Sequence, residues 1–270
     1  MKTPLRYPGG KSRAVPKLCQ WLPAEITEYR EPFLGGGSMA IEMTKRYPDL
    51  PIWVNDLYKP LYNFWLVLRD DGDYLYDQLI QLKQRHPDQG SARQLFLDAK
   101  EKVNELDIGY KDKAVAFYII NKCSFSGLTE SSSFSKQASE SNFSIRGIEN
   151  LKTYSILIKN WKITNNNYND LLTNDESIVT YLDPPYEIKS NLYGKKGNMH
   201  KGFDHDGFAT LCDQFDGHQL ISYNSSQLIR DRFKEWTVSE FAHTYTMRSV
   251  GCYNKVQASR KELVLFNYEV

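Results

Sequence analysis

Apolar and β-branched residues recur in short runs along this chain, and turn-forming residues separate the runs. The clearest run covers residues 177–182 and predicts a buried strand that ends at Asp183. Similar runs predict strands over residues 29–33 and 51–56, with a glycine-rich turn and a helix over residues 38–46 between them. A strand, a turn, a helix and a second strand in this order form a βαβ unit, so the pattern predicts an α/β fold.

The middle of the chain has helical periodicity instead of strands. Residues 74–84, 92–106 and 112–122 carry apolar side chains at helical spacing. The polar, serine-rich segment that follows over residues 124–142 is predicted to be a loop. This change of pattern predicts a helical domain inserted into the α/β domain. The expected boundaries are residues 66–157 for the helical domain, and residues 1–65 together with 158–270 for the α/β domain.

Alternating strands and helices return after Trp161. We predict a helix capped by Asp204 or Asp206, followed by a strand over residues 219–223. Since antiparallel strands are common at the end of a mostly parallel sheet, we expect the last strands to run antiparallel. They are predicted over residues 237–241, 244–248 and 262–268.

The composition is that of a globular protein. With 270 residues, 41% of them hydrophobic, the chain is long enough to bury a full core. Its 34 basic and 33 acidic residues nearly balance, so nucleic-acid binding would need a local patch. No apolar stretch is long enough to cross a bilayer and no apolar leader begins the chain, so we expect no membrane contact and no export.

The four cysteines, Cys19, Cys123, Cys212 and Cys252, stand far apart in the sequence. Because there is no CxxC pair and no histidine cluster, the spacing predicts neither a metal site nor a disulfide framework. We therefore expect reduced thiols in a cytoplasmic protein. The sequence indicates no obligate protein partner.

Asp183-Pro184-Pro185-Tyr186 carries the most specific chemistry in the chain. An exocyclic amine on a planar base is a poor nucleophile, because its lone pair is delocalised into the ring. Two acceptors for its N–H groups, the Asp183 carboxylate and the Pro184 carbonyl, would withdraw that lone pair from conjugation. The two prolines fix the backbone, and Tyr186 offers a face for stacking. The tetrapeptide therefore favours methylation of such an amine, with an ordinary strand-ending turn as the alternative.

A second group of residues has the pattern of a nucleoside site. The loop Leu34-Gly35-Gly36-Gly37-Ser38 follows a predicted strand, where glycines let the backbone approach a ligand closely. Asp56 ends the next strand, at about the distance in sequence at which an acidic residue accepts ribose hydroxyls in Rossmann-like sheets. Lys11, beside two glycines and Tyr7, is a candidate to hold a carboxylate or approach a base.

Four motifs stand in order along the chain. They are Tyr7-Pro8-Gly9-Gly10-Lys11, Glu31-Pro32-Phe33 with its glycines, Asn55-Asp56, and Asp183-Pro184-Pro185-Tyr186. Together they resemble the motifs of the D12 class of DNA N6-adenine methyltransferases, which includes the Dam methylases. Residues 121–128 are similar to a segment of that family's target-recognition region, and Arg248 with residues 260–263 is similar to its closing motif.

The resemblance implies a Rossmann-like catalytic sheet with an inserted helical target-recognition domain. It also implies S-adenosylmethionine as methyl donor, double-stranded DNA as partner, and a target adenine that is flipped out of the duplex. The implied cofactor-binding residues are Tyr7, Lys11, Glu31, Phe33, Gly35, Gly37, Asp56 and Asp183. The implied catalytic residues are Asp183, Pro184, Pro185 and Tyr186, and the implied DNA-binding residues are Lys122, Ser124, Phe125, Ser126, Leu128 and Arg248.

The sequence departs from the family in the recognition segment. Members that read GATC carry Leu-Cys-Arg-Tyr-Asn where this chain has Leu128-Thr129-Glu130-Ser131-Ser132. Arginine is the usual reader of guanine, whereas glutamate accepts from cytosine, so the segment does not predict GATC. Two alternatives to adenine methylation stay open: transfer to cytosine N4, and a DNA-binding protein of the same fold without catalysis.

Overall fold

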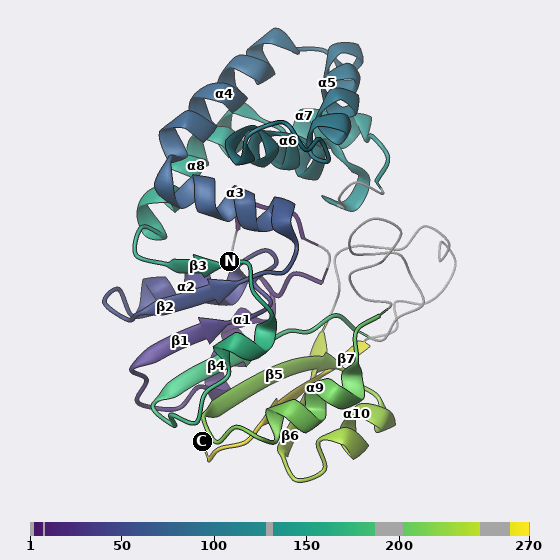
Figure 1. Ribbon diagram of the computed structural model, residues 1–270. Helices are drawn as coiled ribbons and strands as arrows, with labels where there is room; N and C mark the ends of the chain where they lie inside the picture. Colours follow the sequence, from purple (N-terminus) through teal and green to yellow (C-terminus); the bar gives the residue numbers. More distant parts are fainter. Residues whose placement is uncertain (1–2, 8, 128–131, 187–201, 244–259, 270) are drawn as a thin grey trace.

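The computed structural model describes residues 3–7, 9–127, 132–186, 202–243 and 260–269 (Figure 1). These residues form one seven-stranded sheet with ten α-helices around it. The strands are β1 (Glu28–Glu31), β2 (Ile52–Asn55), β3 (Lys162–Thr164), β4 (Ile178–Leu182), β5 (His218–Asn224), β6 (Thr237–His243) and β7 (Arg260–Phe266).

The helices fall into two groups along the chain. Those close to the strands in sequence are α1 (Val15–Leu18), α2 (Ser38–Arg46), α9 (His205–Cys212) and α10 (Gln227–Arg232). The consecutive helices of the middle are α3 (Lys59–Asp70), α4 (Gly72–Arg85), α5 (Gln89–Lys102), α6 (Tyr110–Cys123), α7 (Lys136–Ser141) and α8 (Ile145–Leu157). Three short 3₁₀ helices are η1 (Cys19–Trp21), η2 (Phe125–Gly127) and η3 (Tyr168–Leu171).

The strand order is β3-β2-β1-β4-β5-β7-β6. The first five strands of the chain are parallel, whereas β7 pairs antiparallel with both β5 and β6. The order changes direction between β1 and β4, and ligands of open α/β sheets bind beyond the carboxyl ends of the strands at such a point. The predicted α/β class and the antiparallel end of the sheet are therefore confirmed, and the strand predicted over residues 244–248 lies outside the described residues.

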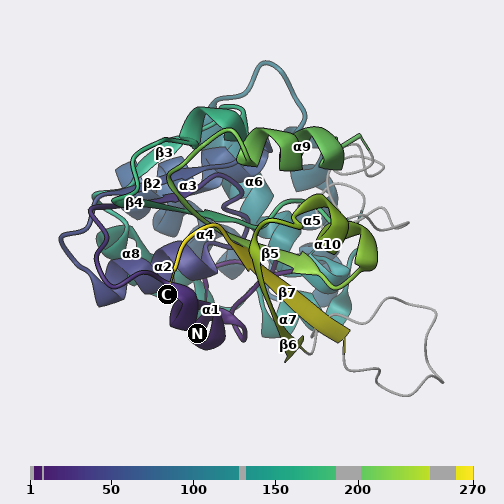
Figure 2. The ribbon, with the colours of Figure 1, turned by 90° about the horizontal axis from the view of Figure 1, so that it is seen from below.

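Helices cover both faces of the sheet, as expected for parallel strands. All five residues of β4 are buried, and consecutive side chains face opposite layers. Tyr181 packs in the cluster that includes α1 and α2, whereas Leu182 packs in the cluster with Phe208 of α9 and Ile229 of α10. Figure 2 shows α9 above the strands and α1 below them.

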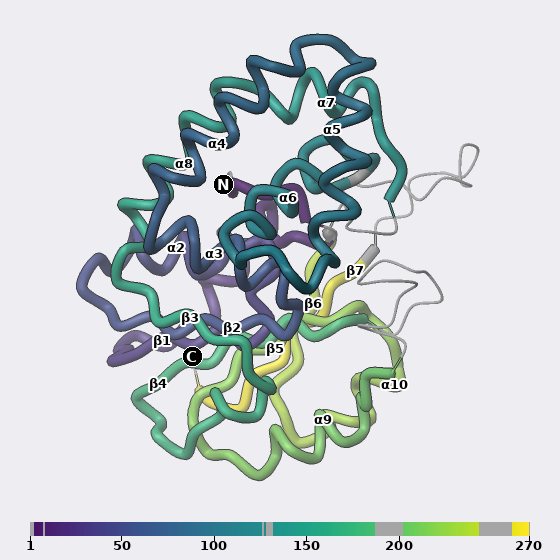
Figure 3. The backbone as a smooth tube through the Cα atoms, turned by 45° about the horizontal axis from the view of Figure 1, so that its top comes forward, coloured from purple at the N-terminus to yellow at the C-terminus, as the bar shows by residue number. Residues whose placement is uncertain are grey.

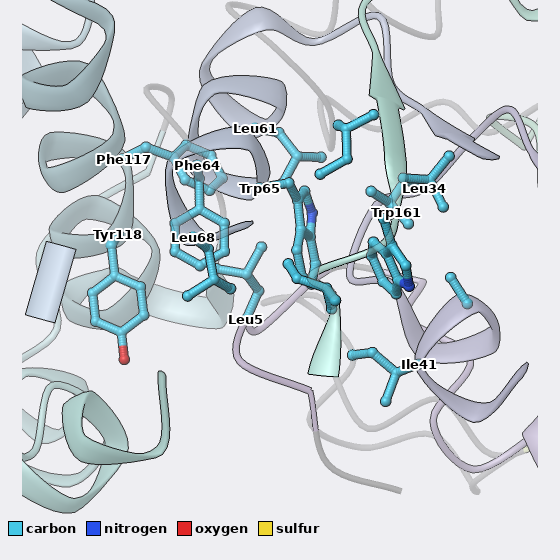
Figure 4. Packing of buried hydrophobic residues seen from close by; sticks show 14 of the residues in the cluster. Leu5, Leu34, Ile41, Leu61, Phe64, Trp65, Leu68, Phe117, Tyr118 and Trp161 are labelled. Carbon is cyan, nitrogen blue, oxygen red and sulfur yellow. The ribbon is translucent and has the colours of Figure 1, made fainter. Parts of the chain in front are cut away.

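The helices of the middle lie together at one end of the sheet (Figures 1 and 3). Their core is continuous with the core of the sheet, because α3 packs against both (Figure 4). Phe64 of α3 stacks on Tyr118 of α6 with ring centroids 5.7 Å apart, and the next residue, Trp65, contacts Trp161 just before β3 at 5.6 Å. The helix α3 runs across residue 65, where the expected domain boundary falls.

Some helices were not predicted from the sequence. Pro60 at the start of α3 suits a first helical turn. The continuous apolar run over residues 64–68 hides the helical spacing of the buried residues, since such a run cannot be told from a buried strand by periodicity alone. The segment over residues 124–142, expected to be a loop, contains α7, whose first turn is capped by the Ser135 hydroxyl. In the described part of the chain, no helix has the length and apolar character needed to span a membrane.

Candidate active site

A cavity of about 340 Å³ lies at the carboxyl ends of β1, β2 and β4. Its volume is in the range of pockets that bind small molecules, about 300–1,000 Å³. It brings together four segments that are distant in sequence. They are the residues around Lys11, the glycine loop from Gly35 to Gly37, Asp56, and Asp183 to Tyr186.

Asp183 stands directly after β4, with 21% of its side chain exposed. Both of its carboxylate oxygens accept hydrogen bonds from Lys11 Nζ, at 2.8 and 3.0 Å, and Oδ1 also accepts from the Ser222 hydroxyl at 3.0 Å. These bonds occupy three of about four acceptor positions on a carboxylate. Burial raises the pKa of Asp183 and Glu262 adds to that rise, while Lys11 opposes it.

Lys11 is a buried cation, with 3% of its side chain exposed. Besides Asp183, its Nζ lies 3.2 Å from Oε1 of Glu262, which is fully buried on β7, and it donates to the Tyr186 hydroxyl at 2.6 Å. Burial lowers the pKa of Lys11, but the two carboxylates outweigh it and raise the pKa above its ordinary value. Lys11 is therefore charged and joins both carboxylates.

Tyr186 is fixed by contacts to one face of its ring and to its hydroxyl group. Its ring stacks on Tyr223 of β5, with centroids 5.6 Å apart and planes inclined by 24°. Its hydroxyl donates to Oε1 of Glu262. Pro184 and Pro185, which line the cavity between Asp183 and Tyr186, have no N–H groups that would compete with a ligand's amine for nearby acceptors.

The glycine loop needs glycine at two positions. Gly35 and Gly37 have φ angles of +49° and +67°, in the left-handed region that side chains disfavour. A Cβ on Gly35 would lie 2.9 Å from the ring of Tyr7, and one on Gly37 would lie 2.9 Å from the ring of Trp65. The loop is therefore packed tightly between the amino-terminal segment and α3.

Asp56 ties the glycine loop to the following helix. Its Oδ2 accepts from the Gly35 N–H at 2.9 Å, and its Oδ1 accepts from the Tyr58 N–H at 3.0 Å. Burial raises the pKa of Asp56 to about 6, although both hydrogen bonds act in the opposite direction. The carboxylate keeps further acceptor positions for hydroxyl groups of a ligand.

Glu31 is the last residue of β1, and Phe33 stands two residues later. Glu31 is buried and accepts from the Tyr29 hydroxyl at 2.9 Å. Burial raises its pKa well above the ordinary value, which favours the neutral carboxyl. Phe33 stacks on Tyr168 at 5.3 Å, and Phe203 closes the same aromatic wall at 5.9 Å. Flat aromatic faces beside the carboxylate of Asp56 suit a nucleoside, so these residues fit the expected cofactor.

The predicted DNA-binding residues differ in exposure. Lys122 and Ser124 are buried, and burial lowers the pKa of Lys122 to about 8, with a further lowering from Arg6. Phe125, in η2, is 47% exposed. Ser126 also belongs to η2, whereas Leu128 and Arg248 lie outside the described residues.

Asn121 connects the middle helices to the amino-terminal segment. Its Oδ1 accepts from the Arg6 N–H at 3.0 Å, and its Nδ2 donates to the Arg6 carbonyl at 2.6 Å and to the Gly127 carbonyl at 3.0 Å. Tyr7, which follows Arg6 in the chain, packs on Gly35 and lines the cavity. One fully buried asparagine therefore links the end of α6 to the cavity wall.

Three residues around the cavity were not predicted from the sequence. Ser222 is an ordinary polar residue in a strand, and Tyr168 stands in a 3₁₀ helix that carries no motif. Glu262 lies in the segment similar to the family's closing motif, but nothing in the sequence placed it at this site. Its position comes from strand register, because β7 runs antiparallel and pairs Glu262 with Asn224 at the carboxyl end of β5.

The sequence of this chain matches a family of known proteins. Residues 7–248 match the family described as D12 class N6 adenine-specific DNA methyltransferase. The chain is 27% identical to the Type II methyltransferase M.MjaIII of Methanocaldococcus jannaschii over 198 residues, 68% of each chain. It is 23% identical to the Type II methyltransferase M1.LlaDCHI of Lactococcus lactis subsp. cremoris, over 97% of this chain and 94% of the relative. The sheet is consistent with the fold of S-adenosylmethionine-dependent methyltransferases.

Proposed function

Since the chain belongs to the D12 class of N6 adenine-specific DNA methyltransferases, we propose that it methylates a flipped-out adenine in a short duplex motif, with S-adenosylmethionine as donor. The observation that carries this proposal is the shared cavity. Residues suited to a nucleoside and residues suited to an exocyclic amine line one space of about 340 Å³. When bound there, S-adenosylmethionine supplies an electrophilic methyl group.

The cofactor side of the cavity is proposed to consist of the glycine loop, Asp56 and the aromatic wall of Phe33 and Tyr168. Asp56 accepts hydroxyl groups of the ribose, and Phe33 stacks on the adenine ring of the cofactor. Gly35 lines the cavity and has no side chain, which supports close approach of a ligand to its backbone. Tyr7, Lys11, Glu31 and Gly37 complete this side.

The target side is proposed to consist of Asp183 to Tyr186. A target adenine reaches this side only when it leaves the base stack, since N6 is shielded in a duplex. Its N6 amine donates to Oδ2 of Asp183, which among the described residues accepts only from Lys11, and to the Pro184 carbonyl. Tyr186, fixed from behind by Tyr223, stacks on the base.

The middle helices are proposed to read the DNA. Residues 66–157 carry the segment similar to the family's recognition region, and Phe125 presents an exposed aromatic ring within it. Lys122, Ser124 and Ser126 are proposed to shape or contact the DNA-binding surface around Phe125. Leu128 and Arg248 are proposed as DNA-binding residues from the sequence alone. The recognised motif is proposed to differ from GATC, because Glu130 stands where an arginine would read guanine.

Transfer of labelled methyl groups to duplex DNA tests the proposal. Asp183→Ala should lower the rate by at least about 10²–10³-fold, because it removes an acceptor that acts on the reacting amine. Asp231→Ala, at an exposed position of α10 away from the middle helices, is the matched control and should leave the rate unchanged. Mass spectrometry of the nucleosides should find N6-methyladenine. Persistent activity in Asp183→Ala would refute the catalytic assignment, and N4-methylcytosine alone would refute the target.

A further inference from the structure

The two carboxylates that share Lys11 stand in different environments. Asp183 borders the cavity, with 21% of its side chain exposed, whereas the side chain of Glu262 is fully buried. Both lie within ion-pair distance of the same ammonium, at 2.8 Å for Asp183 and 3.2 Å for Glu262. Within the described residues, this group of three charges sums to one negative charge.

A lone Lys11–Asp183 pair would be poorly suited to the proposed reaction. If Asp183 accepted a proton from the substrate, the lysine would become an unpaired buried cation, and buried unpaired charges are strongly disfavoured. Glu262 removes this difficulty, because Lys11 keeps an anionic partner after Asp183 is neutralised. The group then passes from one net negative charge to none.

We propose that Glu262 is a positioning residue that neutralises Lys11 and so leaves Asp183 to take up the proton lost by the N6 amine. This inference rests on the proposed function. The N6 lone pair forms the new bond to the methyl carbon, and the sulfur keeps the electron pair of the bond that breaks. The cationic amine then gives one proton to Oδ2 of Asp183, and the electrons of that N–H bond return to nitrogen. The exposed part of Asp183 lets the proton leave to solvent through the cavity.

Other groups near Asp183 modulate the same charge. Tyr181 of β4 and Glu31 of β1 interact electrostatically with it, and Asp183 raises the pKa of both. Ser222 of β5 donates to Oδ1, and the Tyr181 hydroxyl is bonded to that serine. Tyr186 accepts from Lys11 and donates to Glu262. Of these described neighbours, Glu262 is the carboxylate that lies within ion-pair distance of the same lysine.

The closing experiment follows the pKa of Asp183 by carbon-detected NMR in the protein without ligands, with Asp183→Asn to assign the resonance. Glu262→Gln preserves size and removes one negative charge, so the pKa of Asp183 should fall. Glu240→Gln, on the neighbouring strand β6, makes the same change in a surface ion-pair group and should leave the pKa of Asp183 unchanged. An unchanged pKa in Glu262→Gln would overturn the inference, whether or not the protein methylates DNA.

Single-turnover methyl transfer supplies the second measurement. Glu262→Gln should be slower by about 10–100-fold, less than the loss typical of groups that touch the reacting atoms. The acid limb of its pH–rate profile should move to lower pH, which loss of packing alone would not cause. Tyr186→Phe breaks the hydroxyl link but keeps the charge, so its acid limb should stay in place.

A third variant distinguishes loss of the Glu262 charge from loss of the folded structure. Glu262→Asp keeps the charge, so it should retain most of the rate; a loss as large as that of Asp183→Ala would overturn the inference. Wild-type protein that methylates no DNA would refute the proposed function and, with it, the proton transfer. Wild-type activity that Glu262→Gln matches at every pH would refute the role of Glu262 alone.

Discussion

At Asp56, one carboxylate holds the glycine loop in place and faces the cavity. Because burial raises its pKa to about 6, it takes up a proton as the pH falls through that value. If ribose hydroxyls donate to this carboxylate, the dissociation constant of S-adenosylmethionine should rise by up to about tenfold for each pH unit below about 6. Equilibrium dialysis between about pH 5 and 8 measures this dissociation constant. A constant affinity over this range would contradict the assignment.

The same protonation should not unfold the protein. The pKa of Asp56 is higher in the folded state than its ordinary value of 3.8, so the folded state binds this proton more tightly than the unfolded state. The contribution of Asp56 to stability is therefore fully present below about 3.8 and is lost as the pH rises through about 6. Loss of cofactor affinity in mild acid would then reflect the carboxylate itself.

Single residues were predictable from the sequence where a local motif carried them. Asp183, Lys11 and Asp56 each stand beside prolines, glycines or the end of a strand, and they meet at one cavity. Glu262 has no such local signal, because its place depends on pairing with Asn224 across an antiparallel ladder. A shift of one residue in that register would point its side chain to the opposite face, and the sequence does not specify the register locally.

The turn that begins α2 depends on Gly37. Gly37→Ala places a side chain at a φ angle of +67° and 2.9 Å from the ring of Trp65, so we expect a loss of about 2–4 kcal/mol in the free energy of unfolding. Urea unfolding measures it. Gly109→Ala, at the start of α6 with a φ angle of −64°, is the matched control and should change stability by less than about 0.5 kcal/mol. Equal effects of the two variants would contradict the argument.

Among the elements, those with a simple pattern were predicted best. The strand β4 and the helix α2 match the expected positions closely, because one is wholly buried and the other starts directly after a glycine turn. The helix α3 was missed, since its continuous apolar run over residues 64–68 cannot be told from a buried strand by periodicity alone. Short α7 depends on a serine cap within a polar segment that resembles a loop.

For the whole molecule, the continuous core predicts that the middle helices and the sheet unfold together. Far-UV circular dichroism reports mainly on helices, and tryptophan fluorescence reports on positions such as Trp53 in β2 and Trp161 just before β3. The two urea transitions should coincide. Trp65→Ala should shift both by the same amount, with a loss of about 3–5 kcal/mol. Separate transitions would show that the helices form an independent unit.

The insertion of helices into an α/β chain was visible in the sequence, but the sharing of one core was not. Helical periodicity separates residues 66–157 from the strands on either side. The contact between them depends on particular aromatic side chains, with Phe64 facing Tyr118 and Trp65 facing Trp161. Such pairings depend on the three-dimensional arrangement of α3 and cannot be predicted from periodicity alone.

The ion pair between Lys11 and Glu262 joins residues near opposite ends of the sequence. At about 5–20 residues per second, the ribosome needs roughly 10–50 s to make the chain between them. During that time Lys11 has no Glu262 to pair with, and the strand that carries Glu262 is absent from the sheet. The charge arrangement at Asp183 is therefore completed only after β7 has been synthesised, so a nascent chain lacks the finished site until that strand enters the sheet.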